Sequence, residues 1–600
     1  MTSTRRAAHG EGRQSIVTRA LSYIGKVLGS TRGLKVLLCD EELKNALSIV
    51  YTQRELLSHE VILVEQLSNM TRQRMRYLQC IIFCRPTSRA LDDISHEVST
   101  GNYCSYHIFF TTAVSKDYLQ SLANADRQCL IHRVEEVFFD ITPLTGNLAV
   151  VPLSQPSLNP IRLQQWDNSS FVRVVDGLVS TMLMMNRRPV IRYRAGSAVC
   201  ERLGHDLASR MKVVDSDFSD LRDKDAVVVI LDRMDDPCTP LLMQWTYEAM
   251  IHELLGFQDG NKILLKEDGE LNTVEDSVHV LSREQDSFFA ECQYSDWGTL
   301  VQRVQALVKE YKEQNNIDRT SATLEEIKSF LSKFPEAKKR SLLTTRHTLI
   351  ASRLSDEVKA RNLYRLSEVE QQIVESDAVT AHSRAVLDLV KSSETDLDDA
   401  LRLSLIYALR YEQEKSNVVA ELKAELQRRG MPEGKVHLLD TIVALGGATV
   451  RKHQLFKPKV DNLLRGIVQL VPGYNGEVRN VFTMHQPLLQ KIVTRLYNGS
   501  LREDHYPVAH CTGFSTTAAA CSTMSREIIV FIAGGATFEE AKLVFELNAG
   551  TVANNLERGG LVEVLKSSSV VGATEFVDAQ VILCSTGVVN SAQFIQSLLN

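Results

Sequence analysis

The 600-residue sequence contains no apolar segment long enough to cross a membrane. A membrane-spanning helix needs about 20 consecutive apolar residues. The longest apolar runs here, AVVVIL from Ala226 and IIVFIAGG from Ile528, have the length of a buried strand. The basic N-terminus, with Arg5, Arg6 and Arg13, is not followed by the continuous apolar stretch of a secretory signal. We therefore expect any association with a membrane to be peripheral.

The sequence also lacks a strong excess of charge of one sign. Lys and Arg total 68 and Asp and Glu total 74, so the formal net charge is only -6. Affinity for nucleic acid depends on neutralising phosphates with basic residues, so we expect no nucleic-acid partner. The eleven cysteines, an odd number, show no paired spacing, and several lie within apolar runs. This pattern is typical of reduced, buried thiols in the cytosol rather than of a disulfide framework.

The usual catalytic signatures are missing as well. There is no GxSxG nucleophile elbow, no GxxxxGK phosphate loop and no GxGxxG dinucleotide motif. The HELLG sequence at His252 and Glu253 has Gly256 where a zinc protease needs its second histidine. His485 in MHQP stands alone and is interpreted as a structural residue. The sequence therefore predicts no catalytic residue, no cofactor and no metal site.

One enzymatic alternative stays open at the end of an apolar strand. Asp232 ends the run DAVVVILD, and Asp235 and Asp236 follow shortly after it. Open α/β sheets place their sites at the carboxyl ends of strands, and three carboxylates there are suited to Mg²⁺ and a phosphohydrolase reaction. The structural alternative is that Asp232 pairs with a nearby arginine while the other two cap backbone groups of the turn. Because no Gly-rich phosphate loop accompanies them, the structural alternative is favoured.

The first part of the chain alternates between apolar strands and polar helical stretches. Strands are predicted at 34–39, 60–65, 78–84 and 105–111, a pattern typical of a parallel α/β domain. Before them, apolar residues between 16 and 28 recur at helical spacing. A basic amphipathic helix of this kind can lie on a membrane, but docking against the first domain is the favoured interpretation.

A second α/β pattern is interrupted by a long helical segment. A strand at 225–232 precedes the interruption, and apolar strands return at 528–535 and 580–587. Between about 256 and 481 the strand signals nearly vanish, and charged stretches with helical periodicity dominate. Because two or three strands alone form a poor core, we expect the segments on either side of the helical insertion to share one sheet.

Several blocks of the sequence resemble the SM family, the Sec/Munc-type partners of syntaxins. The most distinctive block is LDRMDDPCTPLLMQWTYEAMIHELLG at 231–256. The others are LSREQDSFF at 281–289, KSFLSKFPE at 328–336, LRLSLIYALRYE at 401–412, MHQPLL at 484–489 and IIVFIAGGATFEEA at 528–541. Two further stretches, at 36–67 and 84–94, are similar to the vacuolar protein sorting branch of the family, and VYTQREL is their most characteristic piece. The resemblance covers nearly the whole chain.

The resemblance implies an arch of three domains. These are an α/β first domain at 1–138, a discontinuous α/β second domain at 139–255 and 482–600, and a mostly helical third domain at 256–481 inserted into the second. The order of strands and helices described above predicts the same partition. The sequence departs from the family at Cys238 and Met243, in the Ser/Thr/Ala-rich stretch 511–524 and from about 549 to 578. These departures affect the last domain most.

The resemblance also implies a function that needs no chemistry. Members of the family bind a syntaxin-type (Qa) SNARE and promote assembly of the SNARE complex during vesicle docking and fusion, and they have no known catalytic site or cofactor. The vacuolar protein sorting branch implies endosomal and Golgi trafficking. We accordingly expect a cytoplasmic monomer that associates peripherally with endosome, trans-Golgi or vesicle membranes through its SNARE partners.

Two contact surfaces follow from the same resemblance. The family holds a short N-terminal syntaxin peptide in an apolar groove formed by the last helices of the first domain, which corresponds to 115–139 here. The expected groove residues are Leu119, Leu122, Ala123, Ile131, Val134 and Glu136, and Glu136 is expected to meet a basic residue of the peptide. The alternative for each is an ordinary place in the core between helices. The second surface is a hairpin near 321–354 that contacts SNARE helices, where Phe334 and Pro335 match the family and Pro335 is expected to interrupt a helix.

Overall fold

The described part of the chain forms two compact units. The computed structural model describes residues 15–153, 166–217, 226–258, 260–266, 276–315, 324–456, 482, 485–509, 527–549 and 579–599. Unit 1 comprises Met1–Arg233, Leu489–Ala536 and Glu540–Val588, and unit 2 comprises Met234–Leu488, Thr537–Glu539 and Val589–Asn600. The three-domain boundaries inferred from the sequence stay predictions.

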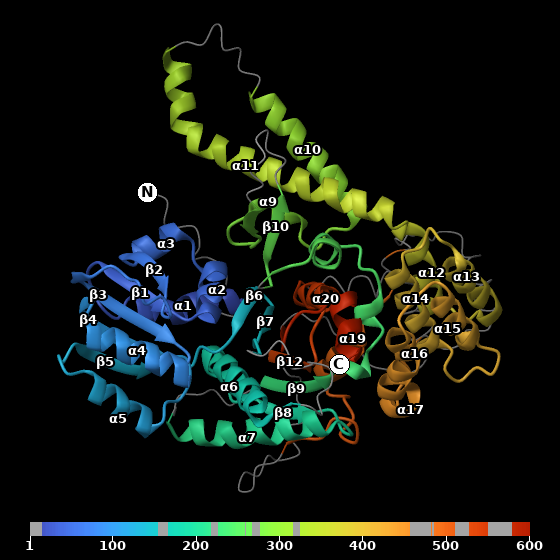
Figure 1. Cartoon of the computed structure of the whole chain (residues 1–600), viewed down its shortest axis with the longest axis horizontal. Coiled ribbons are helices and arrows are strands. Elements are labelled where there is room, and N and C mark those ends of the chain that lie inside the picture. Colours follow the sequence, from blue (N-terminus) through green and yellow to red (C-terminus); the bar gives the residue numbers. More distant parts are fainter. Residues whose placement is uncertain are drawn as a thin grey trace. The chain divides into compact units, whose positions relative to one another are not determined.

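The first sheet of unit 1 has five parallel strands in the order β2-β1-β3-β4-β5 (Figure 1). They are β1 (Lys35–Cys39), β2 (Val61–Gln66), β3 (Met75–Cys84), β4 (Tyr103–Phe110) and β5 (Ile131–Glu136), connected by α2 (Glu41–Val50), α3 (Gln53–Ser58), α4 (Ser88–Thr100) and α5 (Lys116–Ala125). The first four strands lie where the sequence predicts them. The prediction of helix after α5 is wrong, because the chain pairs with β4 as an edge strand from Ile131 onward.

The N-terminal helix α1 (Ile16–Leu28) is docked against unit 1. Ser15 caps it by accepting a hydrogen bond from the backbone N–H of Thr18 at 3.1 Å. Ile16, Ala20 and Ile24 are fully buried in the core that α1 shares with α2 and with the second sheet. The predicted docking is confirmed, and the apolar face of the helix is covered by protein.

The second sheet of unit 1 combines strands from both sides of the helical insertion. Its order is β6-β7-β13-β12-β9-β8, and only the β6–β7 pair is antiparallel. The strands are β6 (Thr142–Thr145), β7 (Leu148–Val150), β8 (Val190–Tyr193), β9 (Ala226–Asp232), β12 (Glu527–Ala533) and β13 (Gln580–Ser585). The expectation of one shared sheet is confirmed. Helices α6 (Asn168–Met185) and α7 (Ala198–Asp217) pack against each other, and α7 packs on β8 and β9.

Unit 2 is mostly helical but contains a β-hairpin. Its helices include α8 (Tyr247–Met250), α9 (Ser287–Cys292), α10 (Trp297–Asn315), α11 (Leu324–Ala360), α12 (Leu363–Glu375), α13 (Val379–Lys391), α14 (Leu397–Arg410), α15 (Val419–Arg428), α16 (Glu433–Gly446), α17 (Ala448–Arg451) and α23 (Ser591–Leu599). Strands β10 (Lys262–Lys266) and β11 (Asp276–Val280) pair antiparallel, so the expectation of almost no strand in this segment is wrong here. Ile263 and Leu265 are buried while Leu264 between them is exposed. Five residues of such alternation are too few to stand out in the sequence.

The predicted hairpin near 321–354 is one arm of a helix pair. Helix α10 packs against α11, and α11 runs from Leu324 to Ala360 without a break (Figure 1). The expectation that Pro335 interrupts a helix is therefore wrong. A proline inside a helix removes one backbone hydrogen bond, and the flanking turns can keep theirs if the helix bends. The α11 ribbon bends along its course in Figure 1.

Helix α6 lies very close to the segment that leads to the second sheet. A Cβ atom built on Gly177 would lie 2.5 Å from Cγ2 of Val151 and 3.1 Å from the carbonyl oxygen of Asp140. The backbone oxygen cannot move aside as the end of a long side chain could. The absence of a side chain at Gly177 is therefore what lets α6 approach this segment.

We expect Gly177→Ala to lower the free energy of unfolding by roughly 1–3 kcal/mol, because the added methyl group overpacks this contact. Gly434→Ala is the matched control, since a Cβ there meets nothing within 4 Å and alanine is the better helix former. Urea unfolding of both variants measures the effect. Equal stability of the two variants would contradict the close-packing account.

Candidate functional site

The first candidate site is where the resemblance places the groove, on α5 and the edge strand β5 of the first sheet. β5 is the last strand in the order, so among the described residues its outer edge has no strand partner. Two apolar side chains are exposed there, Leu119 on α5 at 42% and Val134 on β5 at 37%. Exposed apolar side chains beside an unpaired strand edge are typical of a peptide-binding surface.

The register of β5 decides which of its side chains share a face with α5. Val134 lies opposite Ile108 and Glu136 opposite Phe110. Ile108 and Phe110 belong to the buried cluster that includes Leu122 of α5. Because neighbours in a parallel pair point to the same face of a sheet, Val134 and Glu136 face the side that α5 covers.

The six expected groove residues divide into three groups by their exposure. Leu122 is 2% exposed and belongs to the core, which is the structural alternative for this position. Ile131 is half-buried, and the remaining four side chains are exposed on α5 and β5. The carboxylate of Glu136 accepts a hydrogen bond from the backbone N–H of Val114 at 2.7 Å. Part of the predicted set therefore forms a surface, whereas its role in binding stays a prediction.

Asp126 ends α5, ahead of β5, and the sequence did not point to its role. Its two carboxylate oxygens accept hydrogen bonds from the backbone N–H groups of Leu130 and Ile131, at 2.8 and 2.9 Å. This aspartate ends α5 and turns the chain into the edge strand. An aspartate followed by a short polar stretch is a recognisable turn signal, and it was the available clue that β5 is not a helix.

The second candidate site is the α10–α11 pair, which is anchored by a buried cluster in unit 2. His347 of α11 lies between Tyr247 and Asp286, with Tyr247 Oη 2.7 Å from its Nδ1 and the Asp286 carboxylate 3.0 Å from its Nε2. Asp286 also caps α9 through the N–H of Phe289 at 2.9 Å. Burial opposes ionisation of Asp286, but the hydrogen bond and charge of His347 and the N–H of Phe289 hold its pKa below the ordinary value. His347, in the second half of α11, thus connects this helix to Tyr247 and Asp286.

Phe334 and Pro335 lie in the first half of α11. Only the course of the backbone is described for this part of the helix, and it carries both residues within one continuous segment. Their suggested contact with SNARE helices stays a prediction.

The carboxylates proposed for Mg²⁺ are engaged in local hydrogen bonds. Asp232 accepts one from the hydroxyl of Ser197 at 2.7 Å. Asp236 caps the turn by accepting from Thr239 N at 3.0 Å, Thr239 Oγ1 at 2.6 Å and Leu488 N at 3.0 Å. Across the described ranges no group of three or more histidine, cysteine or acidic side chains is arranged to hold a metal ion. The capping role expected for Asp236 is confirmed.

His485 and HELLG also have structural roles. His485 Nε2 lies 2.9 Å from Thr239 Oγ1, and its backbone N–H donates to Gln371 at 3.0 Å. Glu253 accepts hydrogen bonds from both the backbone N–H and the hydroxyl of Ser591 at the start of α23. These polar groups therefore connect elements of unit 2.

The distinctive block at 231–256 contributes to the core of unit 2. The indole N–H of Trp245 donates to Ser367 at 3.0 Å, and its ring stacks on Tyr364 with centroids 4.9 Å apart. Arg402 of α14 donates to the carbonyl oxygen of Leu241 at 3.1 Å. The unusual composition of the block reflects these buried polar contacts.

Arg402 is the centre of a buried ion cluster. It lies 3.0 Å from Glu370 and 3.1 Å from Asp399, and all three side chains are at most 2% exposed. Arg361 contacts the same Asp399 at 2.7 Å. Burial opposes ionisation of Asp399, but the charges of Arg402 and Arg361 hold its pKa below the ordinary value.

Within the described segments, no helix combines the length and the apolar character that a membrane crossing requires.

Comparison with known proteins assigns the family. The model of the Sec1 family matches residues 35–597, and the chain belongs to this family. Vacuolar protein sorting-associated protein 45 from Dictyostelium discoideum is 32% identical, over 94% of this chain and 96% of that relative. The human protein of the same name is 33% identical, over 91% of this chain and 94% of that relative.

A solved structure extends the likeness to the whole fold. The SM protein Vps45 in complex with the Qa SNARE Tlg2 matches with a TM-score of 0.81 and 29% identity, over 97% of both chains. The assignment to the Sec/Munc-type family and to its vacuolar protein sorting branch is confirmed, as is the mixed α/β and helical fold class.

We expect Arg402→Met to lower the free energy of unfolding by about 3–5 kcal/mol, because it leaves Glu370 and Asp399 buried without their shared counter-charge. The matched control is Lys435→Met, which removes an exposed pair with Asp398 at 2.6 Å and should change stability by less than about 1 kcal/mol. Thermal unfolding of both variants measures the difference. A loss below about 1 kcal/mol for Arg402→Met would show that the cluster adds little to the fold.

Proposed function

We propose that this chain binds a syntaxin-type Qa SNARE and promotes SNARE complex assembly during vesicle docking and fusion. The observation that carries the proposal is the match over 97% of both chains to an SM protein whose structure was solved with a Qa SNARE. Relatives that are 32% and 33% identical bear the name of a vacuolar protein sorting protein. Endosome, trans-Golgi and vesicle membranes are the proposed places of action, with the SNARE as the membrane anchor and this chain as a monomer.

The α5–β5 groove is the proposed site for the N-terminal peptide of the SNARE. Leu119, Ala123 and Val134 offer apolar surface, and Ile131 is partly available. Glu136 places a carboxylate at the end of β5, where a lysine or arginine of the peptide has a counter-charge. An apolar peptide with one basic residue fits this combination. The unpaired edge of β5 offers backbone groups for the same peptide.

The α10–α11 pair is the proposed site for SNARE helices. Its two long helices pack against each other, and α11 is fixed at His347. Phe334 and Pro335 lie in the first half of α11, far along the helix from this anchor. A helix that contains a proline and is held at a point beyond it is suited to bending and straightening in response to a bound helix.

Leu119→Arg should weaken binding of a Qa SNARE N-terminal peptide at least about tenfold, since apolar burial of this side chain is replaced by the cost of desolvating a charge. Isothermal titration calorimetry with the full chain measures the affinity. Leu57→Arg is the matched control, because Leu57 is 52% exposed on α3, away from the groove, and should leave the affinity unchanged. Unchanged affinity in a folded Leu119→Arg protein would overturn the assignment of the groove.

Pro335→Ala should favour the straight form of α11 and change the rate of SNARE assembly by several-fold, because alanine restores the missing backbone donor. A reconstituted liposome fusion assay measures the rate. Thr345→Ala, at an exposed position of the same helix, should behave like the unchanged protein. Assembly at the unchanged rate with Pro335→Ala would remove the bending of α11 from the account.

A further inference from the structure

The carboxyl edge of the first sheet has the architecture of a ligand site. In open α/β sheets, ligands bind outside the carboxyl ends of the strands at the point where the strand order reverses. Here β1 continues through α2 to β2 on one side, while β3 lies on its other side. Asp40 directly follows β1 and Arg85 directly follows β3. These two side chains therefore stand at the switch point.

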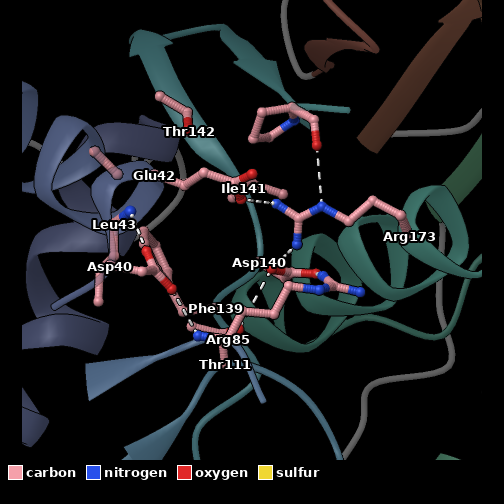
Figure 2. A pocket seen from close by; sticks show the side chains of 12 residues that line it. Asp40, Glu42, Leu43, Arg85, Thr111, Phe139, Asp140, Ile141, Thr142 and Arg173 are labelled. Carbon is pink, nitrogen blue, oxygen red and sulfur yellow. Dashed lines mark hydrogen bonds and ion pairs between the residues drawn. The ribbon is translucent and has the colours of Figure 1, made fainter. Parts of the chain in front are cut away.

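This crevice is occupied by side chains of the same chain. Asp140 lies between the first sheet and β6, and its side chain is 3% exposed. Figure 2 shows its carboxylate between the guanidinium groups of Arg85 and Arg173. Asp140 forms an ion pair with each of them and accepts a hydrogen bond from Thr111 at 3.4 Å. Asp140 thus fills the crevice with a carboxylate of the same chain.

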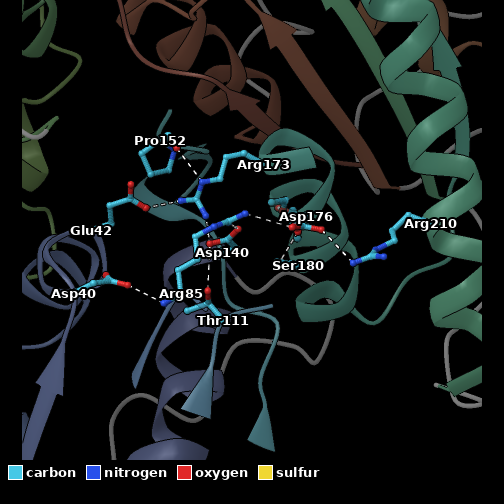
Figure 3. Close-up of polar contacts among 12 residues, drawn as sticks. Asp40, Glu42, Arg85, Thr111, Asp140, Pro152, Arg173, Asp176, Ser180 and Arg210 are labelled. Carbon is cyan, nitrogen blue, oxygen red and sulfur yellow. Dashed lines mark hydrogen bonds and ion pairs between the residues drawn. The ribbon is translucent and has the colours of Figure 1, made fainter. Parts of the chain in front are cut away.

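Ion pairs connect the carboxyl edge of the first sheet with α6, and arginines on both sides contribute to them. Arg173 on α6 reaches back to Glu42 on α2 at 2.6 Å and donates to the carbonyl oxygen of Pro152 at 3.0 Å. Arg85, at the end of β3, reaches forward to Asp176 on α6 at 3.3 Å. Figure 3 shows these contacts as one connected network. The network therefore joins the carboxyl edge of the first sheet to α6.

The region where the carboxyl edge of the first sheet meets α6 has a polar side and an apolar side. The cluster that contains α1, α2 and α6 forms a continuous apolar core between the two sheets. At the polar side a pocket remains open, lined by Glu42, Leu43, Arg85, Asp140 and Arg173 among others (Figure 2). Charged groups that lose their partners here can gain water, whereas the apolar core loses contacts if it opens. An opening on the polar side therefore costs less than one through the apolar core.

We propose that Asp140 is a tethered ligand which, with Arg85 and Arg173, forms a latch over the carboxyl edge of the first sheet. When the latch opens, the crevice between β1 and β3 becomes accessible while both sheets and their shared core stay folded. The proposal is independent of any partner. It rests on the position of the switch point, the burial of Asp140 and the contacts that cross the junction.

Two cysteines beside the latch are natural reporters of its opening. Cys39 is the last residue of β1 and Cys84 the last of β3, and both are buried free thiols. Cys80 lies deeper in β3, and Cys584 lies in β13 of the second sheet, and both are also buried. A maleimide reacts with a buried thiol only when the surrounding structure opens. Cys39 belongs to the same apolar cluster as Cys584, and Cys84 to the same cluster as Cys80. Each thiol at the carboxyl edge is therefore matched by a deeper thiol of its own cluster, so faster reaction of the edge thiol alone reports a local opening at that edge.

The experiment is timed alkylation of the folded full chain with N-ethylmaleimide, read for each cysteine by mass spectrometry. In Asp140→Asn, the side chain between Arg85 and Arg173 loses its negative charge. Cys39 and Cys84 should then react at least about tenfold faster, while Cys80 and Cys584 keep their rates. Glu42→Gln removes only the half-exposed partner of Arg173 and should accelerate the same two cysteines by a smaller factor. If Asp140→Asn does not fold, the Glu42→Gln result decides.

Arg210→Met is the matched control. Arg210 contacts Asp176 at 3.5 Å from the outside and is 41% exposed, so its loss should leave all four rates unchanged. Unchanged rates at Cys39 and Cys84 in the latch variants would overturn the proposal. Equal acceleration of all four cysteines would overturn it too, because the effect would then be general destabilisation.

Discussion

The parallel pairing of β9 with β12 is the contact on which the rest of unit 1 depends. The paired residues are 301 positions apart in the sequence, and they pair in register from Ala226 opposite Glu527 to Asp232 opposite Ala533. Arg187 holds Glu527 at one end of the pair at 2.7 Å, and buried Arg233 holds Glu540 beyond the other at 2.8 Å. The chain leaves the sheet after β9 and returns to it in β12, so this pairing joins the strands on either side of the helical insertion. Loss of this pairing would leave each half with an exposed strand edge.

The sequence allowed the elements with long, regular patterns to be predicted. Four strands of the first sheet, the helix α1 and the shared second sheet lie where the apolar runs place them. The elements that the sequence did not predict are short or depend on contacts between residues far apart in the chain. β5 alternates weakly because it is an edge strand with exposed side chains, and the β10–β11 hairpin is only five residues long on each side. The continuity of α11 through Pro335 reflects how the flanking turns absorb a kink, which a single residue type does not reveal.

The same contrast holds for the candidate sites. The resemblance pointed to the groove, but only the register of β5 showed which of its residues share a face with α5. The latch was not predicted, because Arg85, Asp140 and Arg173 are far apart in the sequence and belong to no motif. Conversely, the sequence left a metal site open at Asp232, Asp235 and Asp236 but favoured a structural role, and the hydrogen bonds of Asp232 and Asp236 agree with that role. Spacing along the chain does not report which partners already satisfy a carboxylate.

The central claim is that two separate surfaces of this chain receive a Qa SNARE, the groove at β5 and the α10–α11 pair. The most direct measurement is hydrogen–deuterium exchange of the full chain with and without the purified cytosolic domain of a syntaxin-type Qa SNARE. The account predicts slower exchange in α5, in β5 and along α11, with β12 and β13 unchanged. Binding that leaves α5, β5 and α11 unprotected, or the absence of any binding, would contradict it.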